Sequence, residues 1–239
     1  MENPFIALND IQKEYRNGDV TTTVLRGVTF AIAAGEFVAL MGPSGSGKST
    51  LMHLLGFLDR PTSGTYFFKG TDTTHLTDTE LAHMRSQEVG FIFQAFHLLP
   101  KSTVLENVML PMLYAGIPVS ERKGRAERAL ESVGLSHRLS HLPNQLSGGE
   151  RQRTAIARSL VNEPHVIFAD EPTGNLDTKS GEAVLSILQE LHEKKHVTII
   201  MVTHELEAAQ HAERIIRVRD GLIVGDEQVI DRRRGEYHK

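Results

Sequence analysis

The sequence predicts an α/β fold in which helices cover a parallel sheet. In the second half of the chain, apolar runs at residues 166–169 and 197–202 flank a helical pattern, a spacing typical of parallel strands. The first third is instead rich in short strands separated by turn residues. A mainly helical stretch, at about residues 94–161, lies between the two regions. We therefore expect one continuous fold with lobes.

The composition is that of a folded globular protein. Of 239 residues, 40% are hydrophobic and 23% are charged, and the formal net charge is -4. This charge argues weakly against a dedicated nucleic-acid binder, whose surface is usually basic. The absence of cysteine excludes disulfides, thiolate metal sites and cysteine nucleophiles, and fits a reducing compartment. The N-terminus lacks the layout of a signal peptide, and no apolar run approaches the roughly 18 residues of a membrane span.

The first part of the chain predicts four strands and one helix. β-branched and aromatic residues between turn residues indicate strands at residues 5–11, 23–32 and 64–68. A fourth apolar run, at residues 36–41, leads into a glycine-rich loop. Leucines then recur with helical spacing at Leu51, Leu54, Leu55 and Leu58. This region therefore predicts a strand–loop–helix unit.

The rest of the chain predicts helices and then strands. Helices are expected at residues 122–133, ending before Gly134, and at 150–161. The helix between the two later strands is marked by an apolar stripe that consists of Val184, Ile187, Leu188 and Leu191. The pair Asp220-Gly221 predicts a hairpin between strands at 214–218 and 222–224. The residues after Asp231 look like a short solvated tail.

The glycine-rich loop has the spacing of a phosphate-binding loop. It fits G-x-x-x-x-G-K-[ST] and lies between a predicted strand and a predicted helix. Its residues are Gly42, Pro43, Ser44, Gly45, Ser46, Gly47, Lys48 and Ser49, followed by Thr50. Glycines allow backbone N–H groups to converge on phosphates, and the helix dipole adds positive charge. Lys48 is expected to reach the β- and γ-phosphates, and Ser49 to offer a hydroxyl to Mg²⁺.

Two acids follow the apolar run at 166–169. Unpaired carboxylates at the edge of a core are costly to desolvate, so a functional reason is expected. Nucleotide hydrolysis needs a metal-binding carboxylate and a group that orients water, at the end of a neighbouring strand. We therefore expect Asp170 to hold Mg²⁺ and Glu171 to act as the general base or as the group that orients the water.

A second small-residue loop leads into the helix at 150–161. Leu146, Ser147, Gly148, Gly149 and Glu150 form this segment, in which the hydroxyl and the glycine amides could grip phosphate oxygens at a helix N-terminus. Two such loops, roughly a hundred residues apart, suggest a nucleotide held between two copies of the chain.

With these motifs in this order, the chain resembles the ATP-binding-cassette (ABC) ATPases from about residue 5 to about residue 227. The resemblance implies a P-loop NTPase (RecA-like) core with a parallel sheet, an N-terminal antiparallel β subdomain and an α-helical subdomain. The core would comprise about residues 1–93 and 162–230, the helical subdomain 94–161 and a C-terminal tail 231–239. ATP and Mg²⁺ are the implied cofactors, and ATP hydrolysis is the implied activity.

The resemblance also assigns roles to further residues. Tyr15 lies where the family stacks an aromatic ring on adenine, although an ordinary strand tyrosine is the alternative. Gln94 matches the glutamine that meets Mg²⁺ or the attacking water, the alternative being a solvated loop residue. His204 matches the histidine that touches the γ-phosphate, rather than a structural histidine. Asp177 matches a residue that crosses the dimer interface, and it would also serve as a helix N-cap.

Within the family, the chain looks like the branch that includes the ATPases of LolD, MacB, FtsE and BceA systems. The resemblance implies an ATP-bound homodimer that drives separate membrane permease subunits, with membrane contact only through them, at the cytoplasmic face. Near the partner's coupling helix we expect Phe96, Leu98, Leu99 and Pro100, with Tyr114 alongside, although such residues are as often core. No nucleic-acid partner is expected.

Other features carry weaker expectations. Arg232, Arg233 and Arg234 could touch anionic lipid, but terminal charges are more often solvated. His137 and His141 have i, i+4 spacing with no evident third metal ligand, so they receive no role. The alternative function is a soluble ABC ATPase of DNA repair or translation. Those proteins usually carry coiled-coil insertions or two cassettes, which this sequence lacks.

Overall fold

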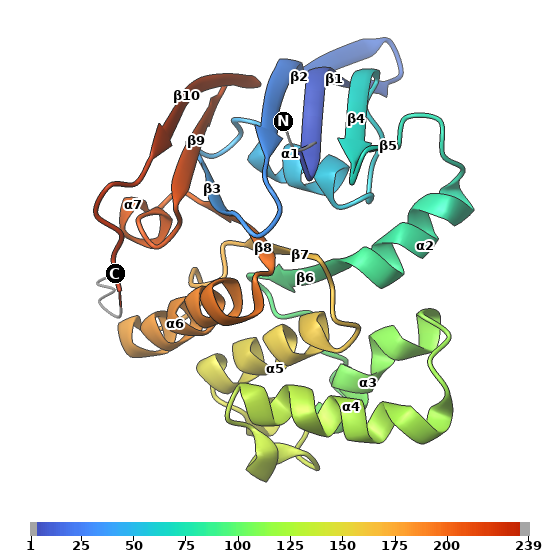
Figure 1. Ribbon diagram of the computed structural model, residues 1–239, viewed down its shortest axis with the longest axis vertical. Helices are drawn as coiled ribbons and strands as arrows, with labels where there is room; N and C mark the ends of the chain where they lie inside the picture. Colours follow the sequence, from blue (N-terminus) through green and yellow to red (C-terminus); the bar gives the residue numbers. More distant parts are fainter. Residues whose placement is uncertain (1–3, 235–239) are drawn as a thin grey trace.

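The computed structural model describes residues 4–234 and contains two sheets. Figure 1 shows the smaller sheet packed above helix α1, and helices α3, α4 and α5 on the far side of the larger sheet. The four-stranded sheet has the order β2-β1-β4-β5 and the six-stranded sheet has the order β10-β9-β3-β8-β7-β6. The molecule is therefore layered, with the larger sheet in the middle.

The smaller sheet is antiparallel throughout. Its strands are β1 (Ile6–Asn17), β2 (Val20–Ile32), β4 (Ser63–Phe68) and β5 (Thr71–Asp72). The hairpin of β1 and β2 extends beyond the predicted strands and pairs Asn17 with Val20. The sequence missed this extension because its residues are mostly exposed and polar, so no apolar alternation marks them.

The larger sheet contains the two strands predicted to be parallel, β7 (Val166–Asp170) and β8 (Thr198–Thr203). Its other parallel strands are β3 (Phe37–Met41), β6 (Val89–Phe93) and β9 (Arg214–Arg219), with β10 (Leu222–Gln228) antiparallel at the edge. The strands β3, β7 and β8 are almost entirely buried, which explains why they appear as continuous apolar runs.

Seven α-helices occur in residues 4–234. They are α1 (Lys48–Leu55), α2 (Asp78–Glu88), α3 (Val104–Tyr114), α4 (Val119–Ser132), α5 (Gly148–Leu160), α6 (Thr178–Lys195) and α7 (Leu206–Ala209), with 3₁₀ turns at Ser136–Arg138 and Pro143–Gln145. Helix α2 has no apolar stripe, since Leu81 is its one buried residue. Its sequence signal is the capping box of Thr77 and Glu80.

The core consists of two clusters on opposite faces of the larger sheet. Along β3, Phe37 and Ala39 belong to one cluster, and Val38 and Leu40 belong to the other. This alternation follows from the period of two along a strand. One cluster packs on α3, α4, α5 and α6, and the other packs on α1 and the smaller sheet. The ends of the parallel strands are therefore held rigidly from both sides.

The C-terminal residues fold back instead of forming a solvated tail. The Arg232 side chain donates to the His211 carbonyl (3.1 Å) and lies 3.5 Å from Glu213 Oε1. The Arg233 Nε donates to Gln210 Oε1 at 2.8 Å. The expected solvated tail is therefore wrong at Arg232 and Arg233, because their partners are far away in sequence. The rest of the tail, residues 235–239, lies outside the described residues. Between residues 4 and 234, no helix is long and apolar enough to span a membrane.

Candidate functional site

The phosphate loop connects the end of β3 to the start of α1. Gly45 and Gly47 have φ values of +77° and +101°, in the left-handed region that glycine adopts without strain. Gly42 lies against strand β9, where an added Cβ would stand 2.0 Å from the Val218 carbonyl oxygen. The glycines of the motif are therefore required by the shape of the loop and by its packing.

Lys48 is the first residue of α1 and is buried. Its Nζ donates hydrogen bonds to the carbonyl oxygens of Gly42 (2.8 Å) and Pro43 (2.7 Å), so the loop closes around the ammonium group. Burial lowers the pKa of Lys48, and the nearby carboxylates of Glu171 and Asp170 oppose this shift. The ammonium is thus positioned at the loop and desolvated.

A cavity of about 680 Å³ opens beside the loop. It is lined by Val24, Pro43, Ser44, Gly45, Gly47, Lys48, Ser49, Thr50, Glu171 and His204. The structure therefore brings together the predicted phosphate loop, the second acid after β7 and the histidine after β8. Val24 was not predicted, because nothing in the sequence distinguishes it from other valines in β2. A volume of this size accommodates a nucleotide.

Asp170 and Glu171 stand at the carboxyl end of β7. Burial raises the pKa of Asp170, and the neighbouring Glu171 charge raises it further, against the smaller effects of His53 and Lys48. Glu171 has a φ of 42°, which is a left-handed conformation for a residue with a side chain. Its amide donates to Val202 O (2.9 Å) and its carbonyl accepts from Gly174 N (3.0 Å), which holds this backbone in place.

The Glu171 carboxylate contacts the imidazole of His204. The distance from Glu171 Oε1 to His204 Nδ1 is 2.8 Å. His204 directly follows β8, the neighbour of β7 in the sheet. Parallel pairing therefore places the two side chains at the same edge, which a sequence pattern cannot reveal by itself.

Gln94 lies beside the loop after Glu171 and does not line the cavity. Its Nε2 donates to Asn175 Oδ1 at 3.4 Å, and Asn175 Nδ2 donates to the Gln94 carbonyl at 3.0 Å. A Cβ at Gly174 would stand 2.5 Å from Gln94 Nε2, so glycine is needed for this contact. The segment after β6 and the loop after β7 are therefore joined by two hydrogen bonds and a close packing contact.

Asp177 and Ser147 are helix N-caps. Asp177 Oδ1 accepts from Ser180 N at 2.9 Å and starts α6, while Ser147 and Glu150 form a capping box that starts α5. Gly149 packs against Ser180, where a Cβ would stand 2.8 Å from Ser180 Oγ. Ser147, Gly148 and Gly149 do not line the cavity. We call residues 146–150 the signature loop. Within a single chain, the signature loop lies outside the cavity that the phosphate loop lines.

Tyr15 does not line the cavity either. Its hydroxyl donates to Asp59 Oδ2 at 2.7 Å, and 43% of the residue is exposed. The pKa of Tyr15 is raised by burial and by Asp59, while Thr50 lowers it slightly. Because Thr50 lines the cavity, the tyrosine hydroxyl stands close to the edge of the cavity. Asp59 was not predicted, since its partner is 44 positions away in sequence.

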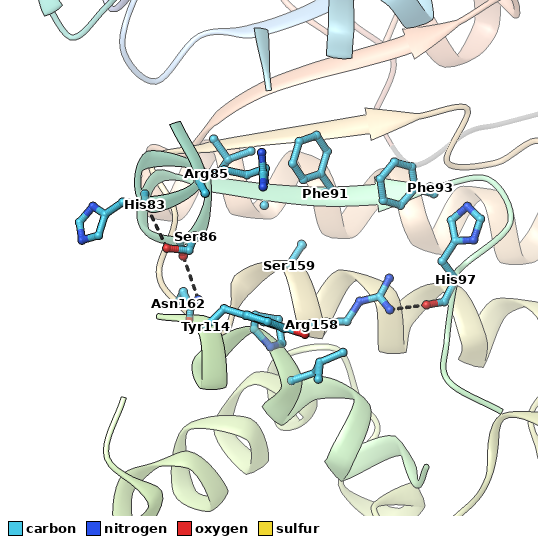
Figure 2. A pocket seen from close by; sticks show the side chains of 15 residues that line it. His83, Arg85, Ser86, Phe91, Phe93, His97, Tyr114, Arg158, Ser159 and Asn162 are labelled. Atoms are coloured by element: carbon cyan, nitrogen blue, oxygen red, sulfur yellow. Dashed lines mark hydrogen bonds between the residues drawn. The ribbon is translucent and has the colours of Figure 1, made fainter. Parts of the chain in front are cut away.

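A second hollow, of about 750 Å³, lies between α2 and β6 on one side and α3 and α5 on the other. Figure 2 shows Arg158 at one end of this interlobe groove, bonded to the His97 carbonyl, and Ser86 with Asn162 at the other. Of the five residues expected at a partner's groove, Tyr114 lines it, whereas Phe96, Leu98, Leu99 and Pro100 do not. Phe96 instead packs on the core and under Arg151.

The charge of the interlobe groove is one-sided. No acidic side chain is among its described lining residues, although Arg85 and Arg158 are. Burial lowers the pKa of Arg158, whose guanidinium donates to the carbonyls of His97 (2.6 Å) and Phe96 (2.8 Å). Phe96 and His97 both have positive φ values, 60° and 49°. Arg158 therefore fixes a strained turn just after Gln94.

The cavity residues suit a polyphosphate and an attacking water. Amides and an ammonium face the place of the phosphates, and a carboxylate paired with an imidazole faces the same space. Ser49, Asp170 and Gln94 offer a hydroxyl, a carboxylate and an amide oxygen, the hard oxygen donors that Mg²⁺ prefers. Within residues 4–234, no group of three or more His, Asp or Glu side chains is arranged to hold a metal by itself. A Mg²⁺ ion here would therefore also need the oxygens of the nucleotide.

The chain matches the protein family described as ABC transporter over residues 25–174. It is 53% identical to an uncharacterized ABC transporter ATP-binding protein of Thermotoga maritima over 92% of this chain and 94% of that protein. It is also 53% identical to the macrolide export ATP-binding/permease protein MacB of Rhodopirellula baltica, over 92% of this chain. The chain spans only 33% of that MacB protein.

Solved structures show the same fold. The dimeric ATP-binding cassette MJ0796 in a post-hydrolysis state, bound to ADP and Pi, has a TM-score of 0.87 and 41% identity. The match covers 95% of this chain and 99% of that one. The α/β fold predicted from the sequence is thereby confirmed.

Proposed function

Because the chain belongs to the ABC transporter family and is one of its ATP-binding, ATP-hydrolysing subunits, we propose that two copies enclose ATP and drive a membrane permease. One observation carries the dimeric part of this proposal. The cavity contains the phosphate loop and Glu171 with His204, but the signature loop lies outside it. A second copy, arranged head to tail, would supply the missing loop across the interface.

In this proposal the phosphate loop binds the nucleotide. The amides of residues 42–50 and the N-terminus of α1 hold the phosphates, and Lys48 exchanges its two carbonyl partners for the β- and γ-phosphates. The phosphates then give the desolvated ammonium a negatively charged partner, whereas the loop carbonyls offer it only partial negative charge. Tyr15 stacks on the adenine.

The hydrolytic step is assigned to Glu171 and His204. Glu171 orients the attacking water and accepts its proton, and His204 holds the carboxylate at 2.8 Å and contacts the γ-phosphate. Ser49, Asp170 and Gln94 would hold Mg²⁺, which neutralises charge on the phosphates when it is bound. The strained backbone of Glu171 fixes the direction of its side chain.

Communication with the helices is assigned to Gln94. Its contacts with Asn175 connect the nucleotide site with the loop that leads to Asp177 at the proposed dimer interface. Toward the helical subdomain, Gln94 is followed by the turn that Arg158 holds. A change at the γ-phosphate would thereby reach both the second copy and the interlobe groove.

The interlobe groove is the proposed docking site for a permease. Its lining combines aromatic and aliphatic residues with neutral polar ones and with Arg85 and Arg158, and it contains no acidic side chain among the described residues, so it fits an amphipathic helix that carries a carboxylate. Several of the relatives are named export ATP-binding/permease proteins. This supports a permease partner, and hence a location at the cytoplasmic face of a membrane, over the alternative of DNA repair or translation. An integral membrane subunit co-expressed with the chain should co-purify with it from membranes, and a chain that stays without this partner would contradict the permease proposal.

The test of the catalytic proposal is Glu171→Gln. This variant keeps the shape of the side chain but cannot accept a proton, so hydrolysis should fall by about a hundredfold or more while ATP binding is retained. In the presence of ATP, the variant should then accumulate as a stable dimer, which size-exclusion chromatography with light scattering measures. Phosphate release near the wild-type rate, or no ATP-dependent dimer, would overturn the assignment.

A further inference from the structure

The Asp59 carboxylate joins two residues of strand β1. Lys13 Nζ lies 2.6 Å from Asp59 Oδ1 and donates to the Arg60 carbonyl at 2.7 Å. The Tyr15 hydroxyl donates to Asp59 Oδ2 at 2.7 Å, and the Arg60 amide donates to Oδ1 at 2.7 Å. Both carboxylate oxygens are therefore engaged, and the group cannot rotate without losing hydrogen bonds.

Burial and charge make this contact firm. Lys13 is only 8% exposed, although lysine is normally among the most exposed residues. Burial by itself would raise the pKa of Asp59, but hydrogen bonds from Lys13, Tyr15 and the Arg60 amide outweigh it, so the pKa is lowered. The carboxylate is ionised at neutral pH and accepts from the tyrosine as a charged acceptor.

Lys13 also acts on the ring of Tyr15. Its Nζ stands 4.8 Å from the ring centroid, over one face. That face is therefore occupied by the ammonium, and 43% of the residue remains exposed, so the ring still has surface that a ligand can contact. Tyr15 pairs with Thr22 of β2, two residues before Val24, which lines the nucleotide cavity. The effect of Thr50, another lining residue, on the pKa of Tyr15 agrees with this position.

We propose that Lys13 and Asp59 form a bracket that fixes the Tyr15 ring at the edge of the cavity, so that Asp59 is a positioning residue for the nucleotide base. The inference rests on the proposed function, in which Tyr15 stacks on adenine. An aromatic side chain near the end of a hairpin would otherwise lose rotational freedom on binding, and a ring fixed beforehand avoids that loss. The bracket also explains why position 15 is a tyrosine and not a phenylalanine, because Asp59 holds the ring by its hydroxyl group.

The test compares ATP with inorganic triphosphate, which reaches the phosphate loop but has no base to stack. Calorimetry gives both dissociation constants for the wild type, Asp59→Asn, Tyr15→Phe and the double variant. Each single variant should weaken ATP binding by about 3- to 10-fold. The double variant should bind ATP no more weakly than the weaker-binding single variant, because Asp59→Asn removes the charged acceptor of the hydrogen bond whose donor Tyr15→Phe removes. Triphosphate affinity should not change, and in steady-state kinetics KM should rise with kcat unchanged.

Glu88→Gln is the matched control. Glu88 is also a carboxylate that pairs with a lysine, Lys69 at 3.1 Å, but it lies away from the cavity. It should leave both affinities unchanged. Thermal melting of each variant identifies any that unfolds. If Asp59→Asn unfolds, Tyr15→Phe still tests the inference, because it leaves the ion pair of Lys13 and Asp59 in place.

The outcomes separate the inference from its premise. Equal loss of ATP and triphosphate affinity in Asp59→Asn, or additive effects in the double variant, would show a merely structural ion pair and overturn the bracket. Tyr15→Leu tests the premise, because removing the ring should weaken ATP binding more than either variant does. If Tyr15→Leu has no effect, the stacking role fails. If Tyr15→Leu weakens ATP binding and Asp59→Asn does not, only the bracket fails.

Discussion

The phosphate loop and the signature loop are both small-residue segments at the start of a helix, yet their charged groups differ. At the phosphate loop, burial lowers the pKa of Lys48 and raises that of Asp170, so both shifts disfavour the charged forms. At the signature loop, the Ser147 amide lowers the pKa of Glu150, and in the adjacent loop Ser180 lowers the pKa of Asp177. The charged forms are favoured there.

The difference indicates what each loop lacks. Lys48 in the phosphate loop and Asp170 beside it are desolvated charges that their protein partners compensate only in part, and a bound polyphosphate with its metal would compensate them further. In the signature loop the capping box of Ser147 and Glu150 satisfies the Ser147 and Glu150 amides, whereas the other amides of the first helical turn have no carbonyl partner within the helix. The signature loop is therefore stable without a ligand, and in the proposed function its amides would meet a phosphate that another chain holds.

Among these variants, Ser147→Arg is expected to show the largest difference between the roles of the two loops, because it should change hydrolysis but not ATP binding. The long cation would replace the small hydroxyl that is proposed to meet the phosphate held by a second copy, so hydrolysis should fall by about a hundredfold without preventing the copies from pairing. ATP affinity of the single chain should stay the same, because the phosphate loop is untouched. Phosphate release and calorimetry measure the two effects. Ser147→Thr, which preserves the cap, is the control.

A mixture of variants sharpens the same comparison. Lys48→Ala removes the ammonium and should weaken ATP binding itself, so neither this variant nor Ser147→Arg hydrolyses ATP alone. In an equal mixture, mixed dimers contain one intact pair of loops, and activity should return to about a quarter of the wild-type value. An absence of any return, with mixed dimers demonstrated by light scattering, would contradict a site shared between copies.

A moderate effect is expected from Asn175→Ala. This change removes both hydrogen bonds to Gln94, so Gln94 loses its position relative to the catalytic acid. Turnover should fall by about 3- to 10-fold while ATP affinity stays constant. Asn162→Ala is a suitable control, since Asn162 donates to Ser86 O (3.0 Å) far from the cavity. If kcat is unchanged in Asn175→Ala, the proposal that Asn175 positions Gln94 is wrong.

The smallest effect concerns acid titration of the nucleotide-free chain. The pKa of Asp170 is raised, so it should gain its proton at higher pH than an ordinary aspartate, and the native state gains stability as it does so. The pKa of Asp177 is lowered, so its stabilisation is present above the unfolded value of about 3.9 and is lost as pH falls through the lower folded value. Carboxyl-carbon NMR should show Asp170 titrating first. The reverse order would contradict the contrast between the two loops.

Much of this arrangement was predictable because its signals are local. The spacing of Gly42, Gly47 and Lys48 determines a loop conformation within eight residues, and the apolar run before Asp170 determines a buried strand. Helix α2 escaped prediction since it buries one side chain, and the extended β1–β2 hairpin escaped because it is exposed. The solvated C-terminal tail was wrong at Arg232, whose contacts are to Glu213 and His211.

The sequence by itself determined which chemical groups are present and in which order. Motifs of a few residues set the phosphate loop, the consecutive acids and the signature loop, because backbone geometry over such distances depends mainly on the local residues. The tertiary structure decided which groups meet. Glu171 contacts His204, Tyr15 contacts Asp59 and Arg158 holds the turn after Gln94 only because parallel strands and packed helices bring distant positions together. It also decided that the two loops lie apart in one chain, which makes the second copy necessary in the proposed function.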